Sequence, residues 1–381
     1  MSPTELRAWL RLLMTPGVGL ERARTLLRAF GLPQQIFEQS EQTLRSVVGP
    51  VIAQALAQEP PDLDVLLERT RSWLDEGGNR RVVTLGDEAY PAVLLNLDDP
   101  PLLLYMCGGG ESTQLGRGVA IVGSRNPTPQ GTDHARQFAR QLASAGCTVV
   151  SGLARGIDAA AHTGALDGAT APTHVMPTVA VVGTGLDRVY PKDHHELAHR
   201  IAAHGLLISE YPLGTPPRPE NFPRRNRLIA ALSQGTLVVE AALQSGSLIT
   251  ARLAAELGKE VFAVPGSIHS PQSRGCHALI RQGAQLVEGA DEVWDAIRDR
   301  PSTATGFVAD SAGVTGSGAQ LDPEEPVWQV MDFDPVGLDA LQARCGLETA
   351  ALQAQLLTLE LQGRIRRLPG GMYQRCGLRV D

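Results

Sequence analysis

The chain has 381 residues, too many for one ordinary domain, so two or three domains are expected. Its 41 acidic and 34 basic side chains give a net charge of −7, which argues against a nucleic-acid partner. Residues 113–290, however, carry 16 basic and 12 acidic groups, a net charge of +4, so the centre of the chain is compatible with a polyanionic partner. Five cysteines without a CxxC pair exclude a disulfide framework and a zinc module, and no apolar stretch reaches the roughly 20 residues of a membrane span, so we expect a cytoplasmic protein without membrane contact.

The first expected domain, residues 1–105, is predicted to be helical as far as residue 76. Its clearest pattern is a helix, a glycine turn and a second helix in LLMTPGVGLERARTLLRAFG, residues 12–31. Such a turn presents backbone N–H groups to a phosphate in helix-hairpin-helix DNA modules. The same pattern fits a SAM-like domain that packs helices or contacts a protein, so both interpretations stay open.

The second expected domain, residues 106–299, alternates short β-branched runs with segments of helix length. The runs are apolar on both faces, which predicts a parallel sheet covered by helices on both sides, with right-handed crossovers. The expected fold class is therefore α/β, an extended Rossmann-like, doubly wound and mainly parallel sheet. The glycines after the first run do not form GxGxxG, so dinucleotide binding is not supported. The runs are VAIVGS (119–124), TVVSGL (148–153), VAVVGT (179–184), LLISE (206–210), TLVVEA (236–241) and EVFAVPG (260–266).

A flexible linker is expected at residues 300–326, which are rich in Ala, Gly, Ser and Thr and lack periodicity. The last domain, residues 327–381, is predicted to hold three helices and then a two-stranded hairpin around a Pro-Gly-Gly turn, the winged-helix pattern. Its third helix carries Glu348 and Glu360 and no basic residue before Arg364. Contact with a protein is therefore at least as well supported as readout of duplex DNA.

Polar and glycine-rich motifs follow all six predicted strands. Because the carboxyl ends of parallel strands meet at one edge of the sheet, where doubly wound folds bind ligands, we expect these motifs to form one binding edge. Gly123-Ser124-Arg125 offers backbone donors and a guanidinium before a helix start, which suits a phosphate. Ser245-Gly246-Ser247 offers a second hydroxyl-rich helix start, although ordinary helix capping uses the same residues.

The stretch FPRRNRLIAAL, residues 222–232, is predicted to begin a helix at this edge, with Pro223 in its first turn. By helical periodicity Arg225 lies above the buried stripe, so its side chain is expected to reach out at the edge with its stem buried. Arg224 and Arg227 fall on the flank and are expected to widen the contact. Three arginines at a helix N-terminus oppose its dipole, and a bound anion would relieve that cost.

Cations recur along the whole edge, which a ligand with a single phosphate would not require. Lys192 adds a further charge, and Phe222 and Tyr190 offer aromatic faces among the cations. A charged track with interleaved aromatic side chains fits single-stranded nucleic acid, because the backbone charge gives affinity and stacking tolerates any base.

An acid–base pair is conceivable in GLARGIDAAAH, where Asp158 and His162 lie one helical turn apart. Alternatively, the two residues form a structural pair without a catalytic role, since a helix dipole favours Asp in the first turn. No nucleophile or metal-ligand cluster accompanies the pair. We therefore expect no catalytic residue, and we interpret Asp158, His162, Gly183, Gly185 and Glu240 as structural residues beside the site.

Six motifs occur in register between residues 119 and 290, namely IVGSR (121–125), SGLARGID (151–158), GTGLDRVYP (183–191), SEYPLGTPPRPENFPRRNRLIA (209–230), SGSLITA (245–251) and FAVPGS (262–267). With these motifs the chain resembles the DprA/Smf family of bacterial DNA-processing proteins. The resemblance implies a cytoplasmic homodimer that binds and protects single-stranded DNA and loads the recombinase RecA onto it during natural transformation. It implies no catalytic turnover, cofactor or metal, and single-strand-binding protein is a further expected partner. Only residues 167–177 depart from the family pattern, which usually has a shorter Gly-rich link.

Two alternatives remain at this stage. One is an enzyme that processes a nucleotide through Asp158, His162 or Glu240, and the other is a winged-helix regulator that binds duplex DNA. The arginine cluster favours single-stranded DNA over the enzyme, and the acidic third helix disfavours the regulator. The resemblance and the residue patterns together predict these DNA-binding residues: Gly123, Ser124, Arg125, Gly152, Ala154, Arg155, Gly156, Lys192, Phe222, Arg224, Arg225, Asn226, Arg227, Ser245, Gly246 and Ser247.

Overall fold

The structure is a computed structural model that describes residues 1–109, 117–169, 175–298, 331, 336–345, 347, 349–361, 365–368 and 372–375. The chain divides into two compact units, Met1–Ser311 and Ala312–Asp381, and each is described by itself. The linker expected at 300–326 lies outside the described residues, as does all but one residue of the helix expected at 327–333.

The first unit begins with six helices that share an apolar core. The first helix starts with a capping box, in which Ser2 Oγ accepts from the Glu5 amide at 3.2 Å and the Ser2 amide donates to Glu5 Oε2 at 2.6 Å. Buried Leu10 and Leu26 belong to a core that continues onto Tyr105 of the sheet. The helices are α1 (Pro3–Met14), α2 (Leu20–Phe30), α3 (Pro33–Phe37), α4 (Glu41–Val48), α5 (Pro50–Ala57) and α6 (Leu63–Asp75).

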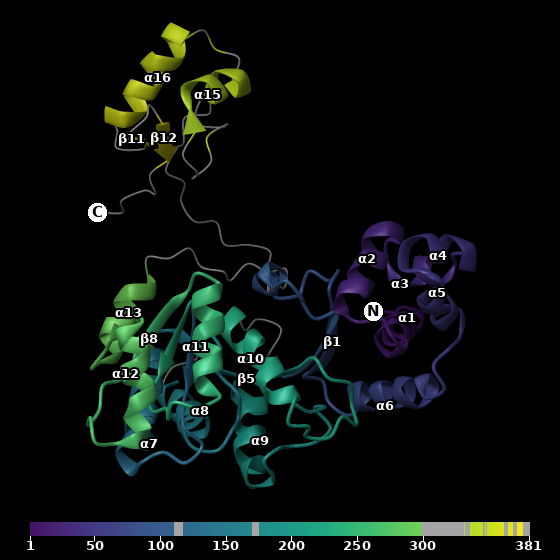
Figure 1. Cartoon of the computed structure of the whole chain (residues 1–381), viewed down its shortest axis with the longest axis horizontal. Helices are drawn as coiled ribbons and strands as arrows, with labels where there is room; N and C mark the ends of the chain where they lie inside the picture. The colour runs from purple at the N-terminus through teal and green to yellow at the C-terminus, as the bar shows by residue number, and fades with distance from the viewer. Residues whose placement is uncertain are drawn as a thin grey trace. The chain divides into compact units, whose positions relative to one another are not determined.

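A nine-stranded sheet forms the centre of this unit, with strand order β1-β2-β6-β5-β4-β3-β7-β8-β9 (Figure 1). The seven strands from β6 to β9 in this order are parallel, whereas β2 is antiparallel to both β1 and β6. The strands are β1 (Arg80–Thr84), β2 (Leu103–Gly108), β3 (Arg117–Val122), β4 (Cys147–Ser151), β5 (Thr178–Val181), β6 (Leu206–Ser209), β7 (Gly235–Val238), β8 (Glu260–Ala263) and β9 (Gln285–Leu286).

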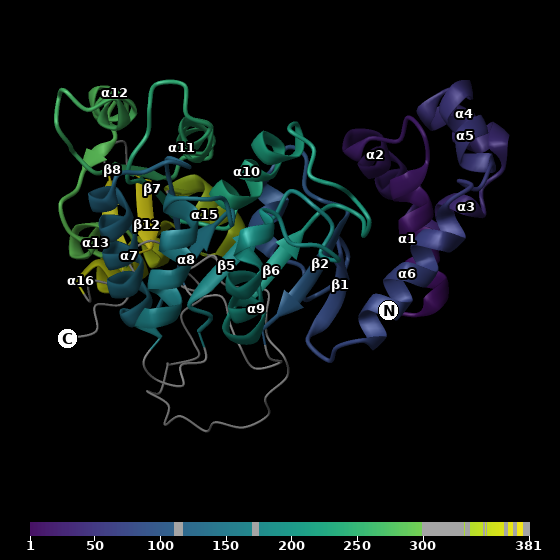
Figure 2. The same cartoon turned by 90° about the horizontal axis from the view of Figure 1, so that it is seen from below.

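Helices cover both faces of the sheet, as Figure 2 shows. Side chains alternate between the faces along β3, so Val119 and Ile121 pack against α7, α8 and α13, whereas Ala120 and Val122 pack in the core formed with α10, α11 and α12. These helices and α9 are α7 (Pro129–Ser144), α8 (Ile157–Gly168), α9 (His195–His204), α10 (Asn221–Ala231), α11 (Ser247–Glu256), α12 (Arg274–Arg281) and α13 (Ala290–Arg298), joined by the 3-10 turns η1 (Ala92–Asn96), η2 (Lys192–His194) and η3 (Pro271–Ser273).

The expected doubly wound, mainly parallel sheet is confirmed, and all six predicted runs form strands. The structure differs in the segment 1–105, which was expected to be one helical domain. Strand β1 and most of β2 lie in this segment, and β2 pairs with β6. The sequence of β2, LLYMCG, is buried at nearly every position, so it lacks the alternation that marks a strand with one exposed face.

The second unit has the expected winged-helix arrangement of helices followed by a hairpin. Leu341, Leu352, Leu356 and Ile365 are buried in its core. Three strands form its sheet in the order β10-β12-β11. The elements are β10 (Val336–Gly337), α15 (Leu338–Cys345), α16 (Thr349–Leu361), β11 (Ile365–Leu368) and β12 (Met372–Arg375).

Candidate nucleic-acid interface

The chain changes direction across the sheet at β3. After β3 it adds β4, β5 and β6 on one side, and then it returns to add β7 and β8 on the other side. The loops that leave β3 and β7 therefore diverge and open a crevice at the carboxyl edge. This switch point is where doubly wound sheets bind ligands.

Two adjoining cavities open at this edge. The first, the switch pocket, has a volume of about 450 Å³ and lies between the loops that follow β3 and β7. The second, the loop pocket, has a volume of about 720 Å³ and lies between the loop after β4 and residues 190–193. Their common wall is formed by residues that line both cavities: Arg125, Asn126, Ala154, Phe222 and Arg225.

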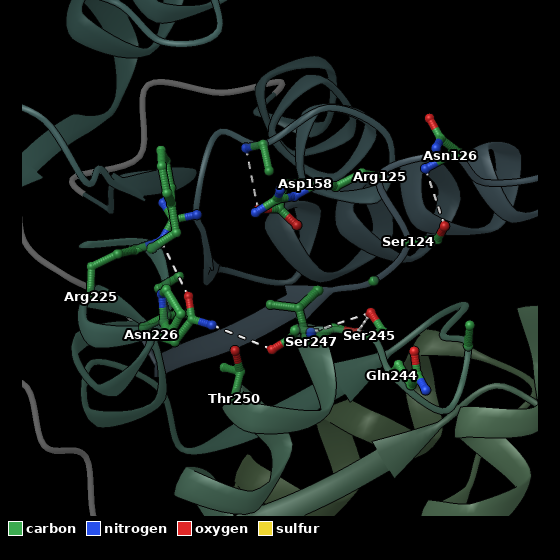
Figure 3. Close-up of a pocket in the computed structure, with 18 of the residues that line it drawn as sticks. Ser124, Arg125, Asn126, Asp158, Arg225, Asn226, Gln244, Ser245, Ser247 and Thr250 are labelled. Carbon is green, nitrogen blue, oxygen red and sulfur yellow. Dashed lines mark hydrogen bonds between the residues drawn. The ribbon is translucent and has the colours of Figure 1, made fainter. Parts of the chain in front are cut away.

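The switch pocket is rich in hydroxyl and amide groups, and Figure 3 shows them around a single opening. Sequence reasoning found only part of this set. It missed Asn126, which directly follows the IVGSR motif, and Gln272, which belongs to a polar motif after β8. It also missed Gln244 and Thr250, which lie directly before and within the SGSLITA motif. The polar lining residues are Ser124, Asn126, Asn226, Gln244, Ser245, Ser247, Thr250 and Gln272.

The loop after β3 is fixed by its own backbone and by Glu240. The Ser124 amide donates to the Glu240 carbonyl at 2.7 Å, and Ser124 Oγ accepts from the Asn126 amide at 3.1 Å. The Glu240 carboxylate accepts from the amide and the hydroxyl of Thr128, the N-cap of α7, at 2.9 and 2.5 Å. The Glu240 carboxylate thus holds the start of α7, and Arg125 is left exposed at the opening.

Glycine is required where this loop approaches its neighbours. A Cβ on Gly123 would lie 2.6 Å from Ile157 Cγ1 and 2.8 Å from the Glu240 carbonyl oxygen. Gly156 has φ of +79°, and a Cβ there would lie 2.7 Å from Pro127 Cδ. Both glycines therefore bring the loop after β4 against the loop after β3.

The side chain of Asp158 organises the loop after β4. It is 6 % exposed, and its Oδ2 accepts from the amides of Gly152 and Ala154 at 3.2 and 3.3 Å. Burial raises the pKa of Asp158, and the positive charge of Arg225 opposes this shift. The carboxyl group is therefore occupied in holding the loop, which agrees with a structural role.

His162 also fixes the loop after β4. Its Nε2 accepts from the Leu153 amide at 3.2 Å, and its Nδ1 lies 2.7 Å from Thr178 Oγ1. Because the Thr178 hydroxyl donates to the Val149 carbonyl at 2.7 Å, Nδ1 carries the proton and donates to Thr178. Burial lowers the pKa of His162 to about 3, so the ring is neutral. With no exposed surface, it has no route to a substrate.

Arg225 does not reach out at the edge as expected. Its side chain is buried, and Nη1 donates to the carbonyl oxygens of Gly152 and Val181. Burial lowers its pKa to about 10, which leaves it charged at neutral pH, and Asp158 favours this charged form. The guanidinium lies where a Cβ on Gly152 would be, so this glycine makes room for it. Arg225 is part of the wall between the two cavities.

Arg227 is also placed differently from the expectation, because it does not lie on an exposed flank. Its guanidinium pairs with Glu210 at 2.7 Å and with Asp99 at 3.0 Å, and its side chain is 9 % exposed. Helical periodicity gave no sign of these two carboxylates, which come from other parts of the chain. Of the three arginines at the start of α10, only Arg224 is exposed, so the stretch supplies one surface cation rather than three.

Aromatic rings and cations meet at the common wall. The ring centroids of Phe222 and Tyr190 are 5.4 Å apart, and Tyr190 is 46 % exposed. The Arg125 guanidinium carbon lies 5.8 Å from the Phe222 ring centroid. Lys192 is exposed beside the loop pocket, whereas Arg155 is paired with Asp193 at 2.9 Å.

The serine motif before α11 forms the opposite side of the switch pocket. Ser245 Oγ lies 2.6 Å from Ser247 Oγ and accepts from the Ser247 amide at 3.3 Å. Asn226 Nδ2 donates to the Gly246 carbonyl at 3.4 Å, which connects this motif to α10. The expected residues 245–247 therefore lie opposite the β3 loop and line the same cavity.

Gly183 and Gly185 belong to the loop after β5 and line neither cavity. The Gly183 carbonyl accepts from Asn221 Nδ2 at 2.9 Å, at the first residue of α10. A Cβ on Gly185 would lie 2.7 Å from the Pro212 carbonyl oxygen. These contacts agree with the structural role expected for both glycines.

The described residues contain no group of three or more His, Cys, Asp or Glu side chains arranged to hold a metal ion. Among the helices in the described ranges, none combines the length and the apolar character needed to cross a membrane.

Two family profiles match the chain. DNA recombination-mediator protein A matches residues 81–298, and the DprA winged helix domain matches residues 317–371. Protein Smf of Escherichia coli (strain K12) is 39% identical over 315 residues, which cover 80% of this chain and 80% of that protein. The putative DNA processing protein DprA of Mycobacterium tuberculosis (strain H37Rv) is 34% identical over 381 residues, which cover 94% of this chain and 91% of that protein.

Two solved structures are also similar. DNA processing protein A (DprA) from Streptococcus pneumoniae has 33% sequence identity and a TM-score of 0.64, covering 77% of this chain and 98% of that chain. DNA processing protein A from Helicobacter pylori, whose single-stranded DNA binding mode is the subject of its structure, has 33% identity and a TM-score of 0.50, covering 57% of this chain and 96% of that chain.

Replacing Arg227 by Ala should lower the free energy of unfolding by about 3–5 kcal/mol, because it leaves the Glu210 carboxylate buried without its partner. Urea unfolding at neutral pH measures the change. Arg224→Ala, on the exposed face of the same helix, should change stability by less than about 0.5 kcal/mol. Replacing Arg227 and Glu210 together by Met should cost less than Arg227→Ala alone. A loss for Arg227→Ala as small as that of the control would contradict the assigned ion pair.

Stability should depend on pH through His162, whose pKa is about 3 in the folded protein against an ordinary value of 6.5. Between these values the unfolded chain binds the additional proton, so the free energy of unfolding should fall as pH drops below 6.5. From pH 7 to pH 5, wild type should lose up to about 2 kcal/mol more than His162→Gln. Urea unfolding of both proteins at the two pH values gives this difference. Equal losses would mean that the ring is protonated or exposed in the folded state.

Proposed function

The chain belongs to the DNA recombination-mediator protein A family, and on this premise we propose that it binds single-stranded DNA at the switch pocket and the loop pocket. The observation that carries the proposal lies at and beside the common wall, where the guanidinium carbon of exposed Arg125 is 5.8 Å from the Phe222 ring centroid and the Tyr190 ring packs at a tilt against Phe222. Phosphates would contact the cations, and bases would stack on the rings. Stacking tolerates any base, so binding should not depend on sequence.

A binding function, rather than an enzymatic one, is supported by what the carboxylates and the imidazole at this edge do. Asp158 and Glu240 accept hydrogen bonds that fix the loops after β4 and β3, and the neutral ring of His162 is buried between Leu153 and Thr178. All three groups are thus engaged in fixing loops, although Asp158 also lines the switch pocket, and we assign none of them a proton transfer. The family is named for recombination mediation, which names no chemical reaction.

The finer parts of the proposal follow from the family. We propose that the protein acts as a homodimer in the cytoplasm. It protects single-stranded DNA that enters during natural transformation and loads RecA onto this DNA, where single-strand-binding protein competes for the same strand. The predicted contacts that line one of the two cavities or are exposed are Gly123, Ser124, Arg125, Gly152, Ala154, Arg155, Lys192, Phe222, Arg224, Arg225, Asn226 and the motif 245–247. Arg227 is not among the proposed contacts, because its guanidinium is paired and buried.

Removal of the wall residues should weaken binding of single-stranded DNA. Arg125→Ala should lower affinity for oligo-dT at least about tenfold and reduce the slope of log K against log salt by about 0.7, since one phosphate contact is lost. Phe222→Ala should cost about 1–3 kcal/mol of binding free energy if a base stacks on the ring. Fluorescence anisotropy over a salt series measures both effects. Arg140→Ala, at an exposed position of α7 that lines neither cavity, is the matched control and should bind as wild type does. Preference for duplex DNA, or unchanged affinity in both variants, would refute the proposal.

The RecA part requires its own experiment. Wild-type protein should accelerate RecA filament assembly on single-stranded DNA that single-strand-binding protein already covers, and Arg125→Ala should do so weakly, because it holds the DNA less well. RecA-dependent ATP hydrolysis reports the assembly. Wild-type protein that binds single-stranded DNA yet leaves the lag before hydrolysis unchanged would limit the function to binding and protection.

A further inference from the structure

A third cavity of about 670 Å³ lies apart from the switch pocket, between α6 and α9, and we name it the α6–α9 groove. Its walls come from α6 and the start of β1 on one side and from residues 186–189 and α9 on the other side. Figure 1 shows α6 reaching the loops beside α9. The helical N-terminal segment, for which the sequence left DNA contact open, thus meets the sheet domain at an open surface.

The charged side chains of this groove are three arginines and two carboxylates. Arg80 pairs with Glu76 at 2.8 Å and donates to the Trp73 carbonyl at 3.0 Å, so it has a structural role. Arg188 pairs through Nη2 with Asp187 Oδ2 at 3.3 Å.

Arg69 differs from these two arginines. It is exposed, and its guanidinium donates to the Leu213 carbonyl at 3.4 Å. Within the part of the chain that the structure describes, no carboxylate lies within ion-pair distance of it. The groove therefore carries a net charge of +1, and among the described residues Arg69 is its arginine outside an ion pair. Such a surface favours a polyanion.

Two imidazole rings add an aromatic surface to the groove. His195 and His199 lie one turn apart on α9, both are exposed, and their ring centroids are 4.5 Å apart. Exposed imidazole rings stack on unpaired bases in complexes with single strands. Cations and rings therefore occur side by side here, as they do at the common wall of the two pockets.

The groove and the loop pocket share one segment of chain. Val189 lines the groove and Tyr190 lines the loop pocket, and then Lys192 lines the loop pocket and His195 lines the groove. Residues 189–195 are therefore the ridge between the two openings. A strand that occupies the loop pocket would cross only this ridge, which carries the exposed Lys192, to reach the groove.

We propose that single-stranded DNA bound in the loop pocket continues over residues 189–195 into the α6–α9 groove. There Arg69 and Arg188 contact its phosphates, and His195 and His199 provide a stacking surface. The proposal rests on the proposed function of the loop pocket, which it extends. It gives the N-terminal helices a direct part in binding single strands, through Arg69 of α6.

The test compares short and long oligo-dT on the protein with Arg69→Ala and Arg188→Ala combined. Oligomers too short to extend beyond the two pockets should bind as tightly as they do to wild type. Long oligomers should lose about tenfold in affinity, and their salt slope should decrease by about 1.4, since two phosphate contacts are lost. His195→Ala with His199→Ala should likewise weaken only the long oligomers. Arg140→Ala again serves as the control, because α7 does not line the groove.

Three results would be distinct. If the Arg69 and Arg188 variant binds oligomers of every length as wild type does, the groove does not carry DNA, although the proposed function stands. If wild type binds no single-stranded DNA, the proposed function itself fails. If the variant binds short oligomers weakly, the substitutions have disturbed the fold. The combined Arg69→Lys and Arg188→Lys variant then tests the groove, because it keeps both charges. It should bind long oligomers about as wild type does. Loss of long-oligomer binding in that variant would overturn the proposal.

Discussion

The guanidinium of Arg225 lies buried where α10, the loop after β4 and strand β5 meet. It donates to the carbonyl oxygens of Gly152 and Val181, so one side chain connects three elements that surround both pockets. A buried charge is tolerated only with compensation, which two carbonyl dipoles and the nearby Asp158 supply. Asp158 in turn holds the amides of Gly152 and Ala154. The positions of the loops at the binding edge are therefore coupled to this single cation.

The arginines at this edge are of two kinds, buried and exposed. Arg225 is buried on two backbone carbonyls and Arg227 is buried in an ion pair, whereas Arg125 and Arg224 are exposed to solvent. The buried side chains of Arg225 and Arg227 lose little conformational entropy when a ligand binds, because they are already ordered. They also keep Phe222 facing the opening. The second kind supplies charge that is free to pair with phosphate. A rigid support with a few exposed cations fits a surface that must hold a strand and then release it.

The sequence was sufficient for the six strands β3–β8, for the binding edge and for most residues that line the switch pocket, because these depend on local periodicity and on where parallel strands end. It was not sufficient for the two buried arginines. Periodicity gives the face on which Arg227 lies, but its partners Asp99 and Glu210 come from an η1–β2 loop and from the end of β6, and only the fold brings them together. Strand β2 was missed for a related reason, since its burial on both faces comes from tertiary packing.

The net charge of −7 is consistent with a DNA-binding role because affinity depends on the potential at the surface that the strand follows. At the common wall and on the ridge 189–195, Arg125 and Lys192 are exposed. Three carboxylates at this edge are engaged: Asp158 by backbone amides, Glu240 by the amide and hydroxyl of Thr128, and Asp193 by Arg155. Each engaged carboxylate has its charge partly neutralised by hydrogen bonds, so it repels a phosphate less than a free one would. The same hydrogen bonds that shape the loops thus also leave their outer surface positive.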